Sequence, residues 1–170
     1  MEGKDSYLPG GDEGTVAARL ARTASVREGL QAFHEGRYAD AVMILREAYL
    51  RDTRDPGTKI FYGMALIPLG EYEMAEKAIR RGIEGSSASA DWLVEVPRLY
   101  GNPRDYDQHK LLLRHRTDRA DPLPAAFLLA YLMAAEGNGA EAARYLDLLG
   151  QRGGPAGERL RAWIAARKPQ

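Results

Sequence analysis

The chain has 170 residues, with 24 Lys and Arg against 24 Asp and Glu, so its formal net charge is zero. Its length, 45% hydrophobic residues and 28% charged residues are typical of one soluble globular domain. The absence of cysteine excludes disulfides, thiolate catalysis and Cys-ligated metal centres. Because phosphate binding usually needs a basic excess, the charge balance also argues against nucleic acid as the main partner.

The first residues of the chain are polar and rich in glycine. Residues 1–14 contain no apolar run, so we expect a disordered or added N-terminal segment and not a signal peptide. Residues 15–24 are expected to form an additional helix at the start of a single domain, 15–168. The longest apolar run, Ala125–Ala135, is too short to cross a bilayer. We therefore expect no membrane span and a cytoplasmic location.

A short pattern recurs along the chain with a spacing of 34 residues. Residues 36–41 (GRYADA) and 70–75 (GEYEMA) share the pattern Gly-x-Tyr-x-x-Ala. One further step reaches Tyr106 in segment 101–106 (GNPRDY), and residues 137–142 (GNGAEA) form a looser fourth copy. In such a pattern the glycine permits a tight turn at a helix end, and the small alanine permits the next helix to cross closely.

Apolar residues on both sides of these turns recur at helical spacing. The stripes before the turns are Val26, Leu30 and Phe33; Ile60, Met64 and Ile67; and Phe127, Tyr131 and Ala134. The stripes after the turns are Ala41, Leu45, Ala48 and Tyr49; Ala75, Ile79 and Ile83; and Ala142, Leu146 and Leu149. The pattern predicts an all-α chain of four helix pairs, at about 22–55, 56–87, 88–120 and 122–150, and a C-terminal capping helix at 155–167.

These units resemble the tetratricopeptide repeat family. The family pattern has a small residue in the first helix, Gly-x-Tyr-x-x-Ala at the turn, then an apolar residue and an alanine. The matching positions are Gly29, Gly36, Tyr38, Ala41, Leu45 and Ala48; Gly63, Gly70, Tyr72, Ala75 and Ile79; and Leu129, Ala130, Gly137, Ala142 and Leu146. The third unit keeps Tyr106, but His109 replaces the turn alanine and Pro97 lies inside the expected first helix. Because proline disrupts a helix interior, we expect that helix to kink or end early.

The resemblance implies an α-solenoid of about four antiparallel helix pairs, with a concave face built from the first helix of each pair. It implies that a protein or peptide partner binds that face. The residues expected to contact the partner are Val26, Leu30, Phe33, Ile60, Phe61, Met64, Ile67, Phe127 and Tyr131. Their apolar character favours an apolar or amphipathic helix over an acidic C-terminal tail. The same residues could instead pack against neighbouring helices, which would close the face with the chain itself.

No set of residues in the sequence predicts catalysis, a cofactor or a metal. The histidines are His34, His109 and His115, and none forms a ligand-spaced pair with another. Two basic stretches, Arg114–Arg119 and Arg80–Arg81, could contact RNA or anionic lipid, but the first stretch includes Asp118, which favours a solvated helix face.

The sequence therefore predicts a non-catalytic adaptor or scaffold that recruits a protein or peptide on its concave face. The inference passes through the fold, because helix-pair repeats serve many unrelated partners. A structural role in a homo-oligomer is the alternative, since repeat stacks with imperfect ends can associate with copies of themselves. The chain could also be one module of a longer polypeptide.

Overall fold

The computed structural model describes residues 24–87, 93–119 and 121–166, and within these ranges all regular structure is helical. The predicted all-α class is thus confirmed for this part of the chain; the expectations for residues 1–14 and 15–23 lie outside it. In chain order the elements are α2 (Ala24–His34), α3 (Tyr38–Arg51), α4 (Pro56–Leu66), η1 (Ile67–Leu69), α5 (Tyr72–Gly85), α6 (Val96–Leu99), α7 (Pro103–Thr117), α8 (Leu123–Ala135), α9 (Gly139–Leu149), η2 (Gly150–Gly153) and α10 (Gly154–Ala166).

None of the helices in the described ranges has the length and apolar character needed to cross a membrane.

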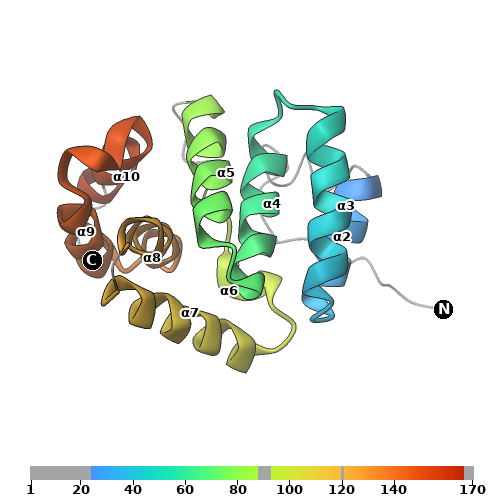
Figure 1. Cartoon of the computed structure of the whole chain (residues 1–170). Helices are drawn as coiled ribbons and strands as arrows, with labels where there is room; N and C mark the ends of the chain where they lie inside the picture. The colour runs from blue at the N-terminus through green and yellow to red at the C-terminus, as the bar shows by residue number, and fades with distance from the viewer. Residues whose placement is uncertain (1–23, 88–92, 120, 167–170) are drawn as a thin grey trace.

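The helices pack mainly with their neighbours along the chain. Helices α2 and α3, α4 and α5, and α8 and α9 form three pairs, and α3 packs on α4. Figure 1 shows α3, α4 and α5 standing side by side with α2 behind α3, whereas α8 is seen along its axis and α7 runs below α8 and α5. Helix α8 packs directly on α5, so the last pair joins the second one. Helix α10 contacts α5, α8 and α9.

The three pairs share one turn geometry. Gly36, Gly70 and Gly137 have φ of 77°, 76° and 81°, a left-handed conformation that glycine adopts without strain. In each turn the glycine N–H donates to the carbonyl three residues back at 3.0 Å, and the next N–H donates to the carbonyl five residues back at 2.8–3.2 Å. This is the hydrogen-bond pattern of a Schellman motif. The alanines that follow are fully buried at the helix crossings: Ala41, Ala75 and Ala142.

Close contact within the second pair depends on Gly63 of α4. A Cβ atom at this position would lie 2.6 Å from Ile79 Cγ1 and 2.9 Å from the Ala75 carbonyl oxygen of α5. These distances are shorter than van der Waals contact, so only glycine permits this approach of α4 to α5.

The third unit departs from the predicted pair at 88–120. Where a first helix is expected, residues 93–100 contain the single turn α6, with Pro97 in its first turn; residues 88–92 lie outside the described ranges. The following turn also differs, because a Cβ on Gly101 would lie 2.1 Å from the carbonyl oxygen of His34, at the end of α2. The sequence predicts a helix that kinks or ends early at Pro97. The structure has in its place a short segment that packs against α2.

Two arginines join the C-terminal helix to α5. Arg159 of α10 donates to the carbonyl oxygens of Ile83 and Ser86, at 2.5 and 2.8 Å, at the C-terminal end of α5. In the opposite direction, Arg80 of α5 donates to the carbonyls of Gly153 and Arg152 in η2. The helix found at 154–166, where the sequence predicts one at 155–167, is therefore anchored by charged hydrogen bonds as well as by apolar packing.

Gly63→Ala is expected to lower the free energy of unfolding by about 1–2 kcal/mol. Overpacking against Ile79 and the Ala75 carbonyl costs up to about 3 kcal/mol, and the gain in helix propensity returns at most about 1 kcal/mol. Gly85→Ala is the matched control, because its nearest new contacts would be 3.7 and 3.9 Å. Urea unfolding followed by circular dichroism measures both; equal stability of the two variants would show that α4 and α5 separate without cost.

Candidate functional site

The nine side chains predicted to line a partner-binding face are buried in the protein core. Each is at most 2% exposed: Val26, Leu30, Phe33, Ile60, Phe61, Met64, Ile67, Phe127 and Tyr131. They pack in one apolar cluster with the rest of the core, so they present no open groove to a partner. Of the two alternatives that the sequence leaves open, the structure has the one in which the chain closes the face itself.

Residues 93–100 cover part of this face. The Tyr100 ring meets the Phe33 ring of α2 edge to face, with centroids 4.7 Å apart and an interplanar angle of 75°. Farther along the segment, the backbone of Val94 hydrogen-bonds the Tyr131 hydroxyl of α8. Val96 and Leu99 are also buried, at 0% and 1% exposed. The segment therefore bridges α2 and α8 and contributes its own apolar side chains to the core.

A cluster of aromatic and polar groups continues from this segment into α7. The Tyr38 hydroxyl donates to Asp105 at 2.7 Å, and the Tyr38 ring meets the His109 ring edge to face at 5.4 Å. His109 Nδ1 lies 3.3 Å from the Tyr100 hydroxyl. Burial raises the pKa of Tyr100 and lowers the pKa of His109, with Asp105 opposing the second shift. Both shifts favour the neutral form of the side chain. At neutral pH the cluster therefore joins α3, Tyr100 and α7 through uncharged Tyr100 and His109.

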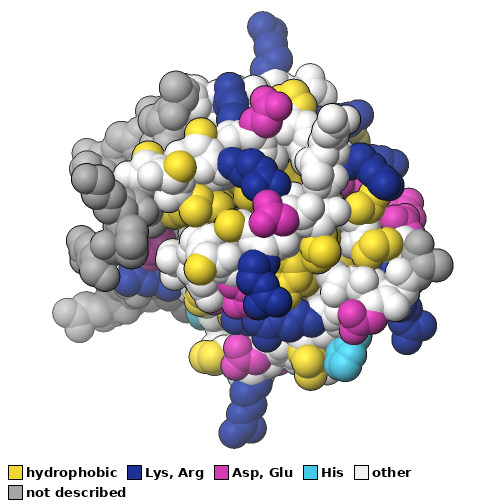
Figure 2. Space-filling model, turned by 90° about the vertical axis from the view of Figure 1, so that its left-hand side faces the viewer, with side chains coloured by type: hydrophobic (Ala, Val, Ile, Leu, Met, Phe, Trp, Pro, Cys, Tyr) yellow, Lys and Arg dark blue, Asp and Glu magenta, His cyan; other side chains and the backbone are white. Residues whose placement is uncertain are grey.

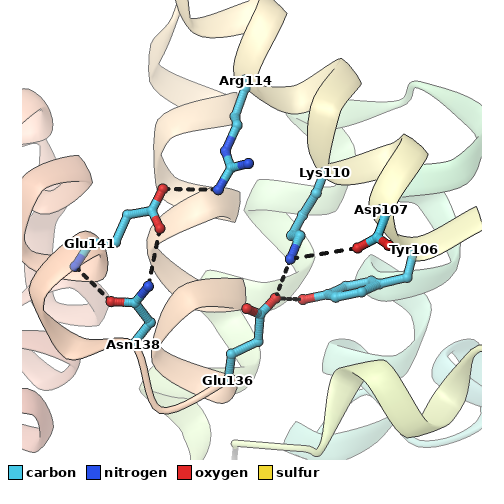
Figure 3. Close-up of polar contacts among 7 residues, drawn as sticks. All are labelled: Tyr106, Asp107, Lys110, Arg114, Glu136, Asn138 and Glu141. Carbon is cyan, nitrogen blue, oxygen red and sulfur yellow. Dashed lines mark hydrogen bonds and ion pairs between the residues drawn. The ribbon is translucent and has the colours of Figure 1, made fainter. Parts of the chain in front are cut away.

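The other face of α7 is held to the turn between α8 and α9 by charged groups (Figure 3). Tyr106, Lys110 and Arg114 follow one another at intervals of four residues, which places them in one row along the helix. Lys110 Nζ lies 2.9 Å from a carboxylate oxygen of Glu136, and the Tyr106 hydroxyl donates to the same oxygen. One turn farther, Arg114 bonds Glu141 at 3.0 Å. These contacts fix the position of α7. Because Arg114 is paired with Glu141, its guanidinium is not free to bind an anionic ligand.

The two basic stretches seen in the sequence do not form one basic surface. Arg80 pairs with Glu76 at 2.9 Å and lies over the Phe127 ring at 3.9 Å, so it serves packing between α5 and α8. Figure 2 shows the side of the molecule that carries α9 and α10, where Lys and Arg side chains alternate with Asp and Glu. On this side of the molecule no continuous basic surface is therefore presented to RNA or lipid.

Two openings flank α5. The larger, with a volume of about 520 Å³, contains as many carboxylates as cations and is lined by Glu73, Glu76, Lys77, Arg80, Asp121, Leu123, Pro124 and Arg152. Within the described ranges no group of three or more acidic or histidine side chains is placed to hold a metal ion. The balanced charges of this opening give it no preference for an anion or a cation.

The smaller opening, which we term the α3–α5 pocket, has a different character. Its volume is about 160 Å³, and its lining comes from three helices: Tyr49 of α3, Lys59 and Tyr62 of α4, and Met74, Lys77, Ala78 and Arg81 of α5. The rings of Tyr49 and Tyr62 stack with centroids 5.8 Å apart and an interplanar angle of 17°. Burial is the main cause that raises the pKa of Tyr62, while nearby Arg46 acts to lower it. The phenol is therefore neutral at physiological pH.

Sequence reasoning missed this pocket, apart from the basic pair that includes Arg81. The one local signal is on α5, where Lys77 and Arg81 are four residues apart and so lie on one helix face, with Met74 one turn before Lys77. The contributions of α3 and α4 depend on how the pairs pack, which the local pattern does not specify.

No protein-family model matches this chain, and no curated protein matches its sequence.

His109→Gln is expected to make the free energy of unfolding less dependent on pH below about 6.5. In the folded chain burial lowers the pKa of His109, so the unfolded chain, with an ordinary histidine pKa of about 6.5, takes up the proton first. Wild-type stability should therefore be full above that value and fall as the pH decreases through the folded pKa. Urea unfolding over a pH series measures the stability of both proteins. The same dependence of stability on pH in wild type and variant would contradict a lowered pKa for His109.

Proposed function

We propose that this chain is a non-catalytic protein-interaction adaptor built from tetratricopeptide-like helix pairs. The observation that carries the proposal is the recurrence of one turn in three pairs: a left-handed glycine, the same two backbone hydrogen bonds and a buried alanine five residues later. Stacked helix pairs of this kind present extended surfaces that bind other proteins. The function is therefore inferred from the fold.

The partner surface is expected on the outside of the first two pairs. The face built from the first helix of each pair is filled by core side chains and covered in part by residues 93–100. Three large apolar side chains are exposed there: Met43 and Leu50 of α3, at 65% and 61%, and Met74 of α5, at 47%. Met43 and Leu50 are seven residues apart, so they lie on the same side of α3. Apolar side chains in contact with water are available to a protein partner at little desolvation cost.

Affinity capture from a lysate of the source cells, followed by reconstitution of each captured protein, tests the adaptor function. We expect at least one captured protein to form a saturable stoichiometric complex with the purified chain in isothermal titration calorimetry. Leu50→Glu should weaken that complex by about 10-fold or more, as loss of a buried apolar contact does.

Leu148→Glu is the matched control. Leu148 is a leucine of similar exposure, 64% against 61% for Leu50, but it belongs to α9 in the last pair. Circular dichroism should show both variants folded. If no captured protein forms a stoichiometric complex, the adaptor proposal is wrong. If the two variants weaken a complex equally or not at all, the function stands and the surface is misplaced.

Self-association is the second candidate, and one feature of α7 favours it. Leu111 and Leu112 of α7 are 52% and 47% exposed, whereas the next residue, Leu113, is buried. A second copy of the chain could cover these leucines. Light scattering at tens of micromolar should then give a mass above that of one chain, about 18.8 kDa, and Leu111→Lys should reduce it. A strictly monomeric mass would exclude this candidate.

A further inference from the structure

The cations of the α3–α5 pocket lack partners within the described ranges. Lys59, Lys77 and Arg81 make no hydrogen bond and no ion pair there, in contrast to Arg80, Lys110, Arg114 and Arg159, which all do. No carboxylate contributes to the lining. The chain as a whole is neutral, so three unpaired positive charges around one small opening are a local concentration of charge that attracts an anionic ligand.

The surface between these cations is apolar. Tyr62 is 7% exposed and stacks on Tyr49, and Ala78 packs against the core, so ring faces and a methyl group form the wall. Met74, at the edge of the pocket, exposes 47% of its surface and has a flexible thioether that adapts to different ligand shapes. A ligand that matches this site therefore carries an apolar group between negative charges.

The size of the pocket discriminates between classes of ligand. Its volume of about 160 Å³ is below the range of about 300–1,000 Å³ that small-molecule sites occupy. It has room for one large side chain, and its lining includes the cations Lys59 of α4 and Lys77 and Arg81 of α5. A nucleic-acid backbone would need a continuous basic surface, and Lys77 also lines the opening that holds Glu73 and Glu76.

We propose that the α3–α5 pocket binds an acidic peptide segment of a partner protein, with one large apolar side chain against Tyr62 and Met74 and carboxylates on Lys59, Lys77 and Arg81. This inference rests on the adaptor function and specifies its ligand. It also places the binding site on residues entirely separate from the nine that the repeat resemblance implies.

The probe is a fluorescein-labelled peptide, Glu-Asp-Glu-Phe-Asp-Glu-Glu, titrated with the full chain and followed by fluorescence anisotropy. We expect saturable binding that weakens by about 10-fold or more when NaCl is raised from about 50 to about 500 mM. Replacing the phenylalanine by serine, or all acidic residues by their amides, should each weaken binding by about 10-fold or more.

Arg81→Glu and Met74→Ala should each weaken binding of the acidic peptide, the first by about 10-fold or more. Arg144→Glu is the matched control for charge: it makes the same change on an exposed arginine of α9 and should leave the affinity within about twofold. Circular dichroism and urea unfolding should show each variant as stable as the wild type.

Three results would overturn the pocket assignment: no saturable binding of the acidic peptide, equal losses in Arg81→Glu and Arg144→Glu, or equal binding of the amide peptide. Displacement of the acidic peptide by a lower concentration of oligothymidylate would assign the pocket to nucleic acid instead. Each of these results leaves the adaptor function to its own test, since a reconstituted complex that persists in Arg81→Glu would show a partner bound elsewhere.

Discussion

The contact between Phe33 and Tyr100 determines how the rest of the molecule is arranged. It joins the first helix pair to the segment that takes the place of the third unit's first helix, and the two rings meet edge to face at 4.7 Å. With Tyr100 fixed there, Gly101 passes against the end of α2, and the first turn of α7 meets the start of α3, where the Tyr38 hydroxyl donates to Asp105. The inner face is closed as a result, and α8 is left to pack on α5.

The parts of the fold that local chemistry determines could be predicted from the sequence. A glycine needed for a left-handed turn and an alanine needed for a close crossing are visible as single letters at a fixed spacing, and Gly36, Gly70 and Gly137 have the expected conformation. Pro97 likewise predicts the loss of a regular helix. These features depend on one residue and its near neighbours, so the sequence pattern was sufficient.

The position of the candidate site depends on packing and could not be read in this way. Val26 and Met64 belong to stripes of apolar residues at helical spacing. That spacing is the same whether the stripe contacts a partner or the chain's own residues 93–100. The α3–α5 pocket combines Tyr49, Lys59 and Arg81 from three helices, and only tertiary packing of those helices brings them together. A stripe of apolar residues therefore identifies what is buried, without identifying the group that covers it.

The reciprocal bonds of Arg80 and Arg159 have a consequence for the order in which the chain folds. Arg159 satisfies carbonyls of Ile83 and Ser86, more than 70 residues earlier in the chain, and Arg80 reaches equally far forward to Arg152 and Gly153. While the chain emerges from the ribosome, the first two pairs are complete long before either bond can form. The carbonyls of Ile83 and Ser86 therefore gain Arg159 as a partner only when synthesis has nearly finished, and docking of the C-terminal helix becomes a late step in biogenesis.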